Sequence, residues 1–363
     1  MFSAFHTLFF LSFFLSCAHA LCECGFNVKL SPTNNSSPIE ATFINTIESD
    51  FTQIQQSSWD PDWFIVTYNQ TTGFLGKIAE TRNVLYNHVV DNTSTSSPGI
   101  FSGDPGVQLI VRSTLQNGMV PMGELRTKRQ DIQYGSFRSR IKFTGINGTC
   151  GASFWYYNDT QEIDMEVLSR EQSTSSSALN LVLQSEQSAQ ADFNAANTSS
   201  FEIAQLGFRA DAQFHEYRMD WTPDQVSFFV DGNWIAEMTT NVPVTGGRLV
   251  FNHWSNGNPG WSAGPPVADA TMTVAYMKAY FNSSDPSINQ DFSASCVDPG
   301  VANASCQVLD NPDFWITKTG NVSGSDSPSS TSTLTPMGTA KSSAGRRGVM
   351  KSAVLISLIY FFL

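Results

Sequence analysis

The sequence is poor in positive charge. It carries 20 Lys and Arg residues against 32 Asp and Glu residues, which gives a formal net charge of −12 at pH 7. Proteins that bind nucleic acid need basic surfaces that neutralise phosphates, and the sequence shows no such basic patch. We therefore expect no nucleic-acid partner. An acidic exterior suits a neutral polymer better than an anionic one.

The chain also lacks a long apolar run. The apolar segment Phe2–Leu15 is followed by the small-x-small site Ala18–Ala20, which is typical of a secretory signal peptide over residues 1–20. The terminal segment Ala353–Leu363 would span only about 16 Å as a helix, short of the ~30 Å of a bilayer core. A spanning helix is the alternative at both ends. Small residues and a polar spacer before the tail instead predict a glycolipid (GPI) anchor signal over residues 344–363.

Large apolar side chains are nearly absent from residues 317–343, which are rich in Ser, Thr, Gly and Pro. Such a segment cannot bury enough surface to offset its ordering entropy, so we expect a flexible, glycosylated stalk. Ten Asn-x-Ser/Thr sites fit passage through the secretory pathway; they begin at Asn34, Asn35, Asn69, Asn92, Asn147, Asn158, Asn197, Asn282, Asn303 and Asn321. We expect a secreted protein of the cell surface or wall, anchored to the plasma membrane only through a lipid.

Cysteines are few. Of six, Cys17 leaves with the signal peptide, so an odd number remains and one thiol is free or pairs between chains. In an oxidising compartment disulfides are favoured over metal binding, and we expect no metal and no cofactor. The favoured bridge is Cys296–Cys306. Cys22 and Cys24 are too close to pair with each other, so one of them is expected to fasten the N-terminus elsewhere.

No helical period persists along residues 21–316, and no internal repeat is evident. Short alternating or β-rich runs are separated by Gly, Pro, Asn and Ser, and Asp231-Gly232 marks a hairpin. This pattern predicts one all-β domain, an antiparallel two-sheet β-sandwich. The expected strands are Val107–Arg112, Ser136–Phe143, Glu162–Leu168, Ala178–Leu183, Glu216–Trp221, Val226–Val230, Trp234–Met238, Arg248–Asn252 and Met272–Phe281.

One of these strands has two contrasting faces. Side chains alternate across a strand, so the apolar residues share one face and the acids share the other. The apolar set is Ile163, Met165 and Val167, and the acidic set is Glu162, Asp164 and Glu166. An ordinary solvated face is the alternative, but acids are poor strand formers and like charges two residues apart repel. Neighbouring aromatic residues also favour a functional cleft.

The spacing of the acids fits glycosidic-bond chemistry. The Cα atoms of Glu162 and Glu166 should lie about 13 Å apart. Side chains leaning together can reach the ~5–5.5 Å carboxyl separation of a retaining pair, and the ~6.5–9.5 Å of an inverting pair is also reachable. Asp164 between them should raise a neighbour's pKa and help to keep one acid protonated as proton donor.

These residues resemble the E-x-D-x-E signature of glycoside hydrolase family 16, the concanavalin A-like jelly-roll glucanases and transglycosylases. Tyr134–Arg140 agrees with it, and Phe214–Gly232 is similar to the family's F-H-x-Y-x-x-x-W-x-P-x-x-I-x-F-x-V-D-G pattern. The resemblance covers roughly residues 57–281. It implies that Glu162 is the nucleophile, Glu166 the acid/base and Asp164 an assisting residue of a retaining double displacement that needs no cofactor.

The resemblance leaves the substrate open. The motif lacks the extra residue of laminarinase-type members, which places it with the licheninase, xyloglucan-transferase and fungal chitin–glucan transferase branches. A β-glucan-type wall polysaccharide is the expected partner of a monomeric enzyme, by hydrolysis or by transglycosylation. A lectin-like binding module and a structural wall mannoprotein are the alternatives.

Sugars bind through aromatic faces and through hydrogen bonds to their hydroxyl groups. The segment from Asn252 to Trp261 mixes Trp with Gly, Asn and Pro, which favours an exposed platform over a core. The candidate substrate-binding residues are Trp155, Trp221, Asn252, Trp254 and Trp261. A place in the core is the alternative for each tryptophan.

Overall fold

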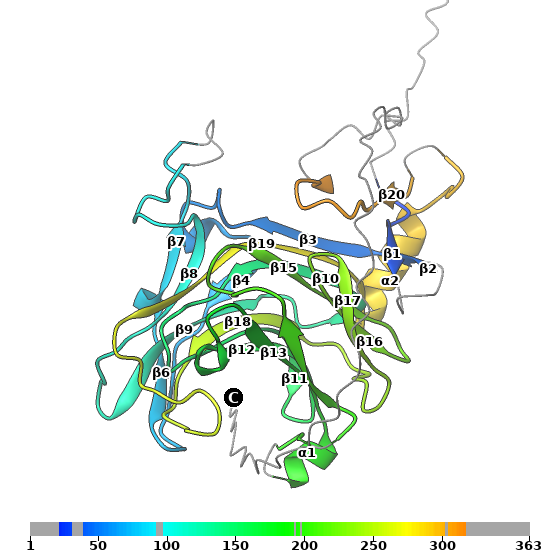
Figure 1. Ribbon diagram of the computed structural model, residues 1–363. Coiled ribbons are helices and arrows are strands. Elements are labelled where there is room, and N and C mark those ends of the chain that lie inside the picture. Colours follow the sequence, from blue (N-terminus) through cyan, green and yellow to red (C-terminus); the bar gives the residue numbers. More distant parts are fainter. Residues whose placement is uncertain are drawn as a thin grey trace, which may run out of the picture.

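Two large β-sheets face each other in the computed structural model (Figure 1). The structure describes residues 22–30, 39–91, 97–191, 194–196, 198–301 and 304–316. Nearly all strand pairs in the two sheets are antiparallel, and a parallel pair joins β6 to β9. The predicted all-β class and the two-sheet sandwich are therefore confirmed. The expected signal peptide, stalk and anchor signal lie outside the described residues.

The first sheet carries the acidic strand near its middle. Its strand order is β14-β13-β12-β11-β18-β9-β6-β5, with β4 paired to β9. The strands are β4 (Trp63–Ile65), β5 (Tyr68–Gln70), β6 (Gly76–Ala79), β9 (Met119–Thr127), β11 (Cys150–Asn158), β12 (Gln161–Leu168), β13 (Ser177–Gln184), β14 (Phe201–Leu206) and β18 (Arg248–Trp254). We call it the acidic sheet.

The second sheet closes the sandwich. Its order is β17-β16-β15-β10-β19-β8-β7, with β3 also paired to β19. The strands are β3 (Asn45–Asp50), β7 (Val84–Asn87), β8 (Gly106–Val111), β10 (Ile132–Lys142), β15 (His215–Trp221), β16 (Val226–Val230), β17 (Asn233–Met238) and β19 (Ala270–Ser283). We call it the backing sheet.

A hydrophobic core fills the space between the sheets because each strand turns its apolar face inward. Ile163 and Met165 of β12 meet Phe137 of β10 and Met277 of β19 in one buried cluster. Burial of apolar side chains at this scale is the main stabilising term of a sandwich. Because the apolar face of β12 is held in the core, the face that carries the three acids points away from the core.

All nine expected strands are present within a few residues of their predicted ends. The hairpin at Asp231-Gly232 is also confirmed: both residues have positive φ, 49° and 74°, and join β16 to β17. The strands that sequence patterns missed include β9 and β11. Pro121 and Gly123 interrupt β9, and β11 opens on Cys-Gly-Ala-Ser, so neither displays the β-rich alternation that identified the others.

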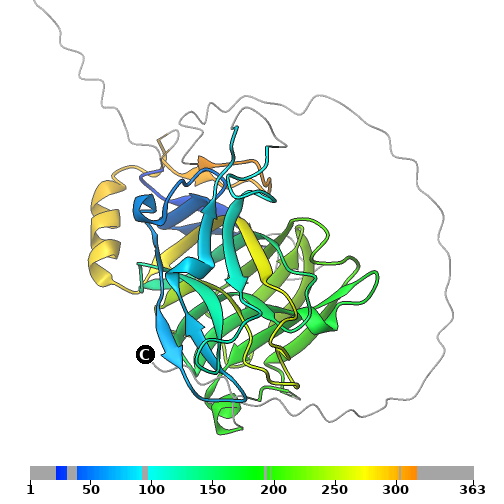
Figure 2. The same ribbon diagram turned by 90° about the vertical axis from the view of Figure 1, so that its left-hand side faces the viewer.

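A third, small sheet lies against the outer face of the backing sheet (Figures 1 and 2). It consists of β2 (Ile39–Phe43), β1 (Phe26–Leu30) and β20 (Cys306–Gln307). Its apolar side chains Val28, Phe43 and Val308 pack on Tyr280 of β19. This packing and the disulfides beside it hold both ends of the described chain on the side away from the acidic sheet.

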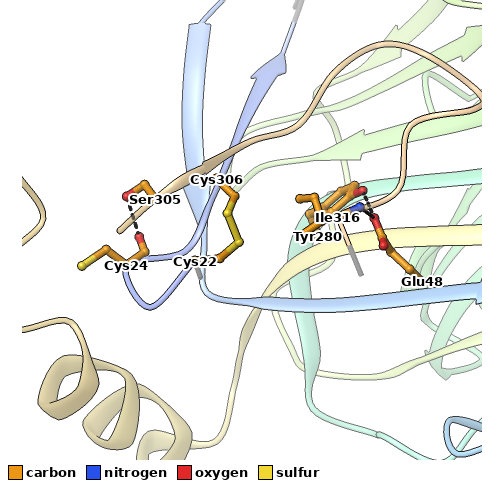
Figure 3. Close-up of a disulfide and its surroundings, with 7 residues drawn as sticks. All are labelled: Cys22, Cys24, Glu48, Tyr280, Ser305, Cys306 and Ile316. Carbon is orange, nitrogen blue, oxygen red and sulfur yellow. Dashed lines mark hydrogen bonds between the residues drawn. A yellow bond between two sulfur atoms is a disulfide. The ribbon is translucent and has the colours of Figure 1, made fainter. Parts of the chain in front are cut away.

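The favoured Cys296–Cys306 disulfide is wrong. Cys22 pairs with Cys306 (Figure 3). Cys24 pairs with Cys296, while Cys150 is free and buried. Both N-terminal cysteines therefore form disulfides. The cysteine that the odd count leaves over is Cys150. The error has a physical reason: proximity in sequence suggested a local loop, but the parallel pairing of β1 with β20 brings the two chain ends together.

Helices are a minor part of the described chain. They are α1 (Glu186–Gln190) and α2 (Pro286–Ser295), with the 3-10 turns η1 (Ser57–Trp59), η2 (Thr81–Asn83) and η3 (Ser169–Glu171). Among the described residues, none of these helices has the length and apolar character to cross a bilayer. Figure 2 shows α2 beside the small sheet and α1 at the opposite end of the molecule.

Candidate active site

The three acids of β12 are buried on the face of the acidic sheet that points away from the core. Glu162, Asp164 and Glu166 are 5%, 4% and 5% exposed. The alternation predicted for β12 is confirmed, since its apolar residues lie in the core. An ordinary solvated face is excluded, because neighbouring side chains of the same face cover the carboxyl groups. Burying three like charges together is costly unless protons or cations reduce the charge.

Protonation reduces the charge at Glu162 and Asp164. Burial, together with the charges of Glu162 and Glu166, raises the pKa of Asp164 well above its ordinary value. Burial raises the pKa of Glu162 to about 8, although a hydrogen bond shared with Asp164 lowers it in part. Because that bond raises the pKa of Asp164 and lowers that of Glu162, the shared proton belongs to Asp164. Glu162 is therefore the acid of the pair that ionises first as pH rises.

Glu166 has a different environment. Burial raises its pKa to about 7, and the nearby Glu171 adds to the rise. The thiol of Cys150 donates to Glu166 Oε1 at 3.3 Å, and this bond, the charge of Lys77 and the nearby Trp261 lower the pKa. A carboxyl group with a pKa near neutrality can both give and take a proton, as general acid–base catalysis requires.

The strands beside β12 carry further polar groups to the same face. On β9, Glu124 accepts from Arg126 Nε at 2.6 Å and from the Tyr68 hydroxyl at 3.0 Å. Tyr156 of β11 lies opposite Glu162 in the β-ladder and donates to Asp159 at 2.9 Å. Carboxylates, guanidinium and phenol groups thus extend the polar face across the sheet.

Two buried polar atoms on this face have no hydrogen-bond partner among the described residues. They are Oδ1 of Asn180 and Oδ1 of Asn252. Asn180 lies opposite Glu166 in the ladder, and Asn252 lies opposite Ala152 of β11. Buried polar groups without partners are destabilising, so their retention points to a partner that the protein alone does not supply. Sugar hydroxyl groups would fit.

Of the four tryptophans predicted to bind substrate, two lie near the acids and two lie in the core. Trp254 and Trp261 join the buried cluster on the acidic face, together with Cys150 and Leu168. The structure therefore brings Trp254, Trp261 and Asn252 to the acids, although the two tryptophans are largely covered and do not form an open platform. Whether they contact substrate stays a prediction.

Trp155 and Trp221 do not lie at the acids and are corrected to core residues. Both are 0% exposed and their rings lie 4.5 Å apart between the sheets. Trp155 pairs with Ile163 in the ladder, so alternation turns it inward. Their indole N–H groups donate to the carbonyl oxygens of Ile132 and Pro243, which satisfies them without a ligand.

The site residues that sequence patterns missed are Lys77, Glu124, Arg126, Cys150 and Asn180. Each meets the acids only through strand pairing over long sequence distances, and one sequence does not reveal that pairing. Alternation within Glu124-Leu-Arg126 around the core residue Leu125 was the available signal. Across the described residues no group of three or more His, Cys, Asp or Glu side chains could hold a metal ion.

Comparison with known proteins identifies the family of the chain. A family model described as "Glycosyl hydrolases family 16" matches residues 91–278, just over half of the 363-residue chain. A "Beta-glucanase" of Acetivibrio thermocellus is 31% identical over 137 residues, which cover 36% of this chain and 37% of that protein. A "Beta-glucanase" of Fibrobacter succinogenes is 30% identical over 144 residues, 36% of this chain and 38% of that protein. The chain thus spans less than two-fifths of the length of these relatives.

Solved structures similar to this chain include a prokaryotic β-1,3-1,4-glucanase (lichenase) derived from a mouse hindgut metagenome. It has a TM-score of 0.49 and 18% identity, covering 65% of this chain and 98% of that one. The apo Crh5 transglycosylase has a TM-score of 0.44 and 19% identity, covering 66% and 85%. With the family model spanning residues 91–278, including the acidic strand, the chain belongs to glycosyl hydrolases family 16.

Proposed function

We propose that the protein is a retaining glycosidase that acts on a β-glucan-type cell-wall polysaccharide. The observation that carries the proposal is the row of three buried carboxyl groups on one strand. Asp164 donates to Glu162 and favours its ionised form, and burial raises the pKa of Glu166 to about 7. A nucleophile and a proton donor on one strand are the two groups that a double displacement needs.

In the first step Glu162 attacks the anomeric carbon while Glu166 gives its proton to the departing glycosidic oxygen. The C–O bond to the leaving sugar breaks and an ester bond to Glu162 forms. In the second step Glu166, now a carboxylate, takes a proton from an incoming hydroxyl group whose oxygen attacks the anomeric carbon and releases Glu162. Water as acceptor gives hydrolysis, and a sugar hydroxyl gives transglycosylation.

Asp164 acts through Glu162. Because it keeps its proton, it adds no third charge and donates to the nucleophile. This bond orients the Glu162 carboxylate and spreads its charge as the ester forms and breaks. The orphaned atoms of Asn180 and Asn252 would then accept from sugar hydroxyl groups beside the reacting bond.

The function is tested by incubation with β-1,3-, β-1,4- and mixed-linkage glucans and chitin oligomers, with all products sized. Shorter products show hydrolysis and longer products show transfer. Glu162→Gln and Glu166→Gln should abolish turnover, whereas Glu216→Gln, on the outer side of the backing sheet where Glu216 accepts from Tyr276, should not. Binding without turnover by the wild type would support a lectin-like module instead.

We also propose that the protein is secreted, monomeric and glycosylated, and is held at the cell surface or wall by a GPI anchor. The supporting features are compositional: the two end segments, the Ser/Thr-rich stretch and the Asn-x-Ser/Thr sites. Release of the protein from intact cells by a phosphatidylinositol-specific phospholipase C tests the anchor. Retention on membranes after complete cleavage of control proteins would contradict it.

A further inference from the structure

A buried lysine faces the catalytic acids. Lys77 of β6 is only 4% exposed, although lysine is almost never buried without a reason. Its ammonium group lies 4.3 Å from the centroid of the Trp254 ring. Trp254 lies directly opposite Cys150 in the ladder, and Cys150 contacts Glu166. The lysine thus belongs to the layer of side chains that surrounds the acid/base.

The charges around Lys77 are of one sign. Glu124 of β9, Glu162 and Glu166 all favour its charged form, while burial disfavours it and lowers its pKa. The thiol of Cys150 also faces it. An ammonium group buried against a tryptophan face and near three carboxyl groups retains its proton more readily than one in an apolar pocket. Lys77 therefore supplies positive charge to a face that is otherwise acidic.

The groups that face Glu166 come from several elements. They are Glu162 and Asp164 of its own strand, Glu171 of η3, the Cys150 thiol of β11, the Trp261 indole and Lys77 of β6. Glu171 is itself engaged by Arg170 at 3.5 Å and by the amide of Asn180 at 3.0 Å. Within this described set, Lys77 is the cation that favours the ionised form of Glu166.

The reaction needs such a cation because Glu166 must work in both protonation states. As acid it must hold a proton, which burial and its acidic neighbours favour. As base in the second step it must be ionised, which the same surroundings oppose. A fixed positive charge nearby offsets the effect of burial and favours the ionised form of Glu166.

We propose that Lys77 is a positioning residue of the reaction: its ammonium group, buried against Trp254, is the counter-charge that allows Glu166 to alternate between acid and base. This inference rests on the proposed function and deepens it. It also explains why a lysine occupies a strand position whose neighbours Ile78 and Ala79 are buried apolar residues. If Lys77 only filled space in the sheet, a methionine of similar length would serve equally well at this position.

The test compares Lys77→Met, which keeps the length and apolar stem but removes the charge, with Lys77→Arg, which keeps the charge. The matched control is Lys278→Met. Lys278 is also buried, also lies over aromatic rings (4.4 Å from the Trp315 centroid), and occupies the outer side of the backing sheet. The pH profile of kcat/KM on an aryl β-glucan oligosaccharide is measured for all three and for the wild type.

The expected result is a shift of the basic limb to higher pH by roughly half to one unit in Lys77→Met, with a smaller upward shift of the acidic limb because Glu162 also feels Lys77. Lys77→Arg and Lys278→Met should keep the wild-type limbs. At acidic pH, turnover limited by the second step should fall by up to about tenfold in Lys77→Met, since one pKa unit changes the ionised fraction tenfold. Unchanged limbs in a folded Lys77→Met protein would overturn the proposal.

A second measurement does not depend on activity. Carboxyl 13C shifts of protein labelled at glutamate, assigned with Glu166→Gln, follow the titration of Glu166 directly. An upward move of its midpoint in Lys77→Met supports the inference even if every tested polysaccharide is the wrong substrate. An unmoved midpoint contradicts it, whatever the outcome for the proposed function. If Lys77→Met does not fold, Lys77→Gln is titrated in the same way.

Discussion

Cys150 donates its thiol hydrogen to the carboxyl group of Glu166 at 3.3 Å, across the β11–β12 ladder. The thiol is buried, and burial with the neighbouring carboxylate raises its pKa well above the ordinary value. It therefore remains a neutral donor at the pH of the reaction. An unpaired cysteine in a disulfide-bonded protein thus has a specific contact with one of the three acids of β12.

Removing this donor should raise the pKa of Glu166. In Cys150→Ala the ionised form of Glu166 loses one hydrogen bond, so the basic limb of the kcat/KM profile should move up by a few tenths of a pH unit or more. Cys150→Ser, which retains a hydroxyl donor, should keep the wild-type limb. Identical pH profiles for the alanine and serine variants would show that the contact has no influence on Glu166.

The buried acids also make stability depend on pH. The pKa of Glu166 rises from 4.5 to about 7 on folding. Between these values the folded state binds more protons than the unfolded state, so the free energy of unfolding falls as pH rises through this window. The stabilising protonation is fully present below pH 4.5 and is lost above about 7.

Glu166→Gln should remove this contribution. Relative to wild type, the variant should gain stability between pH 5 and pH 8, by on the order of 1 kcal/mol per pKa unit removed. The check is the difference between the two unfolding free energies, from denaturant titrations at several pH values, because acids elsewhere such as Asp131 have lowered pKa values and act in the opposite direction. A difference that does not change with pH would refute the assignment.

The orphaned amide oxygens predict a loss of affinity. Asn180→Ala and Asn252→Ala each remove an amide oxygen that has no hydrogen-bond partner among the described residues. Asn252→Ala should therefore cost little stability, whereas Asn180→Ala also removes the amide donor to Glu171 at 3.0 Å and should cost more. If sugar hydroxyl groups are the missing partners, KM for the preferred glucan should rise about tenfold, corresponding to roughly 1–2 kcal/mol.

Trp155→Phe serves as the contrasting variant. Its indole donates to the Ile132 carbonyl inside the core, so its replacement should lower Tm and leave KM unchanged. If instead the asparagine variants lose stability with unchanged KM, the two amides are structural and the substrate runs elsewhere along the face.

The acidic strand could be predicted from sequence because the pattern that identifies it lies within the strand itself. Alternation alone separates Met165 from Glu166, and like charges two residues apart are conspicuous. The partners of those acids could not be predicted. Lys77 lies 89 positions before Glu166, and only the order β12-β11-β18-β9-β6 carries it to the same face.

The errors have the same origin. Trp155 and Trp221 are predicted as substrate-binding residues because sugars bind through aromatic faces, with a place in the core as the alternative for each. Their orientation follows from the register of β11 and β15, which one sequence does not contain. The predicted Cys296–Cys306 disulfide is wrong because one sequence does not show the β1–β20 pairing that brings Cys22 to Cys306.

The two disulfides should stabilise the fold without contributing to the chemistry. They join residues 284 and 272 positions apart and fasten β1, β20 and the end of α2 on the outer side of the backing sheet. Closing so long a loop restricts the unfolded chain strongly, although the second bond adds less because the first already joins the same ends.

The paired variant Cys22→Ser/Cys306→Ser keeps Cys24–Cys296, so it should lose less than the roughly 2–5 kcal/mol of unfolding free energy that a lone disulfide contributes, and its Tm should fall. Its kcat/KM at 25 °C should stay near the wild-type value, since Tyr280, which the small sheet covers, lies on the side of β19 opposite the core. The measurement is thermal unfolding alongside initial rates on the same preparation. A variant with wild-type Tm but reduced kcat/KM would contradict this prediction. It would show that the disulfide at the chain ends affects the acids on the opposite sheet rather than the stability of the fold.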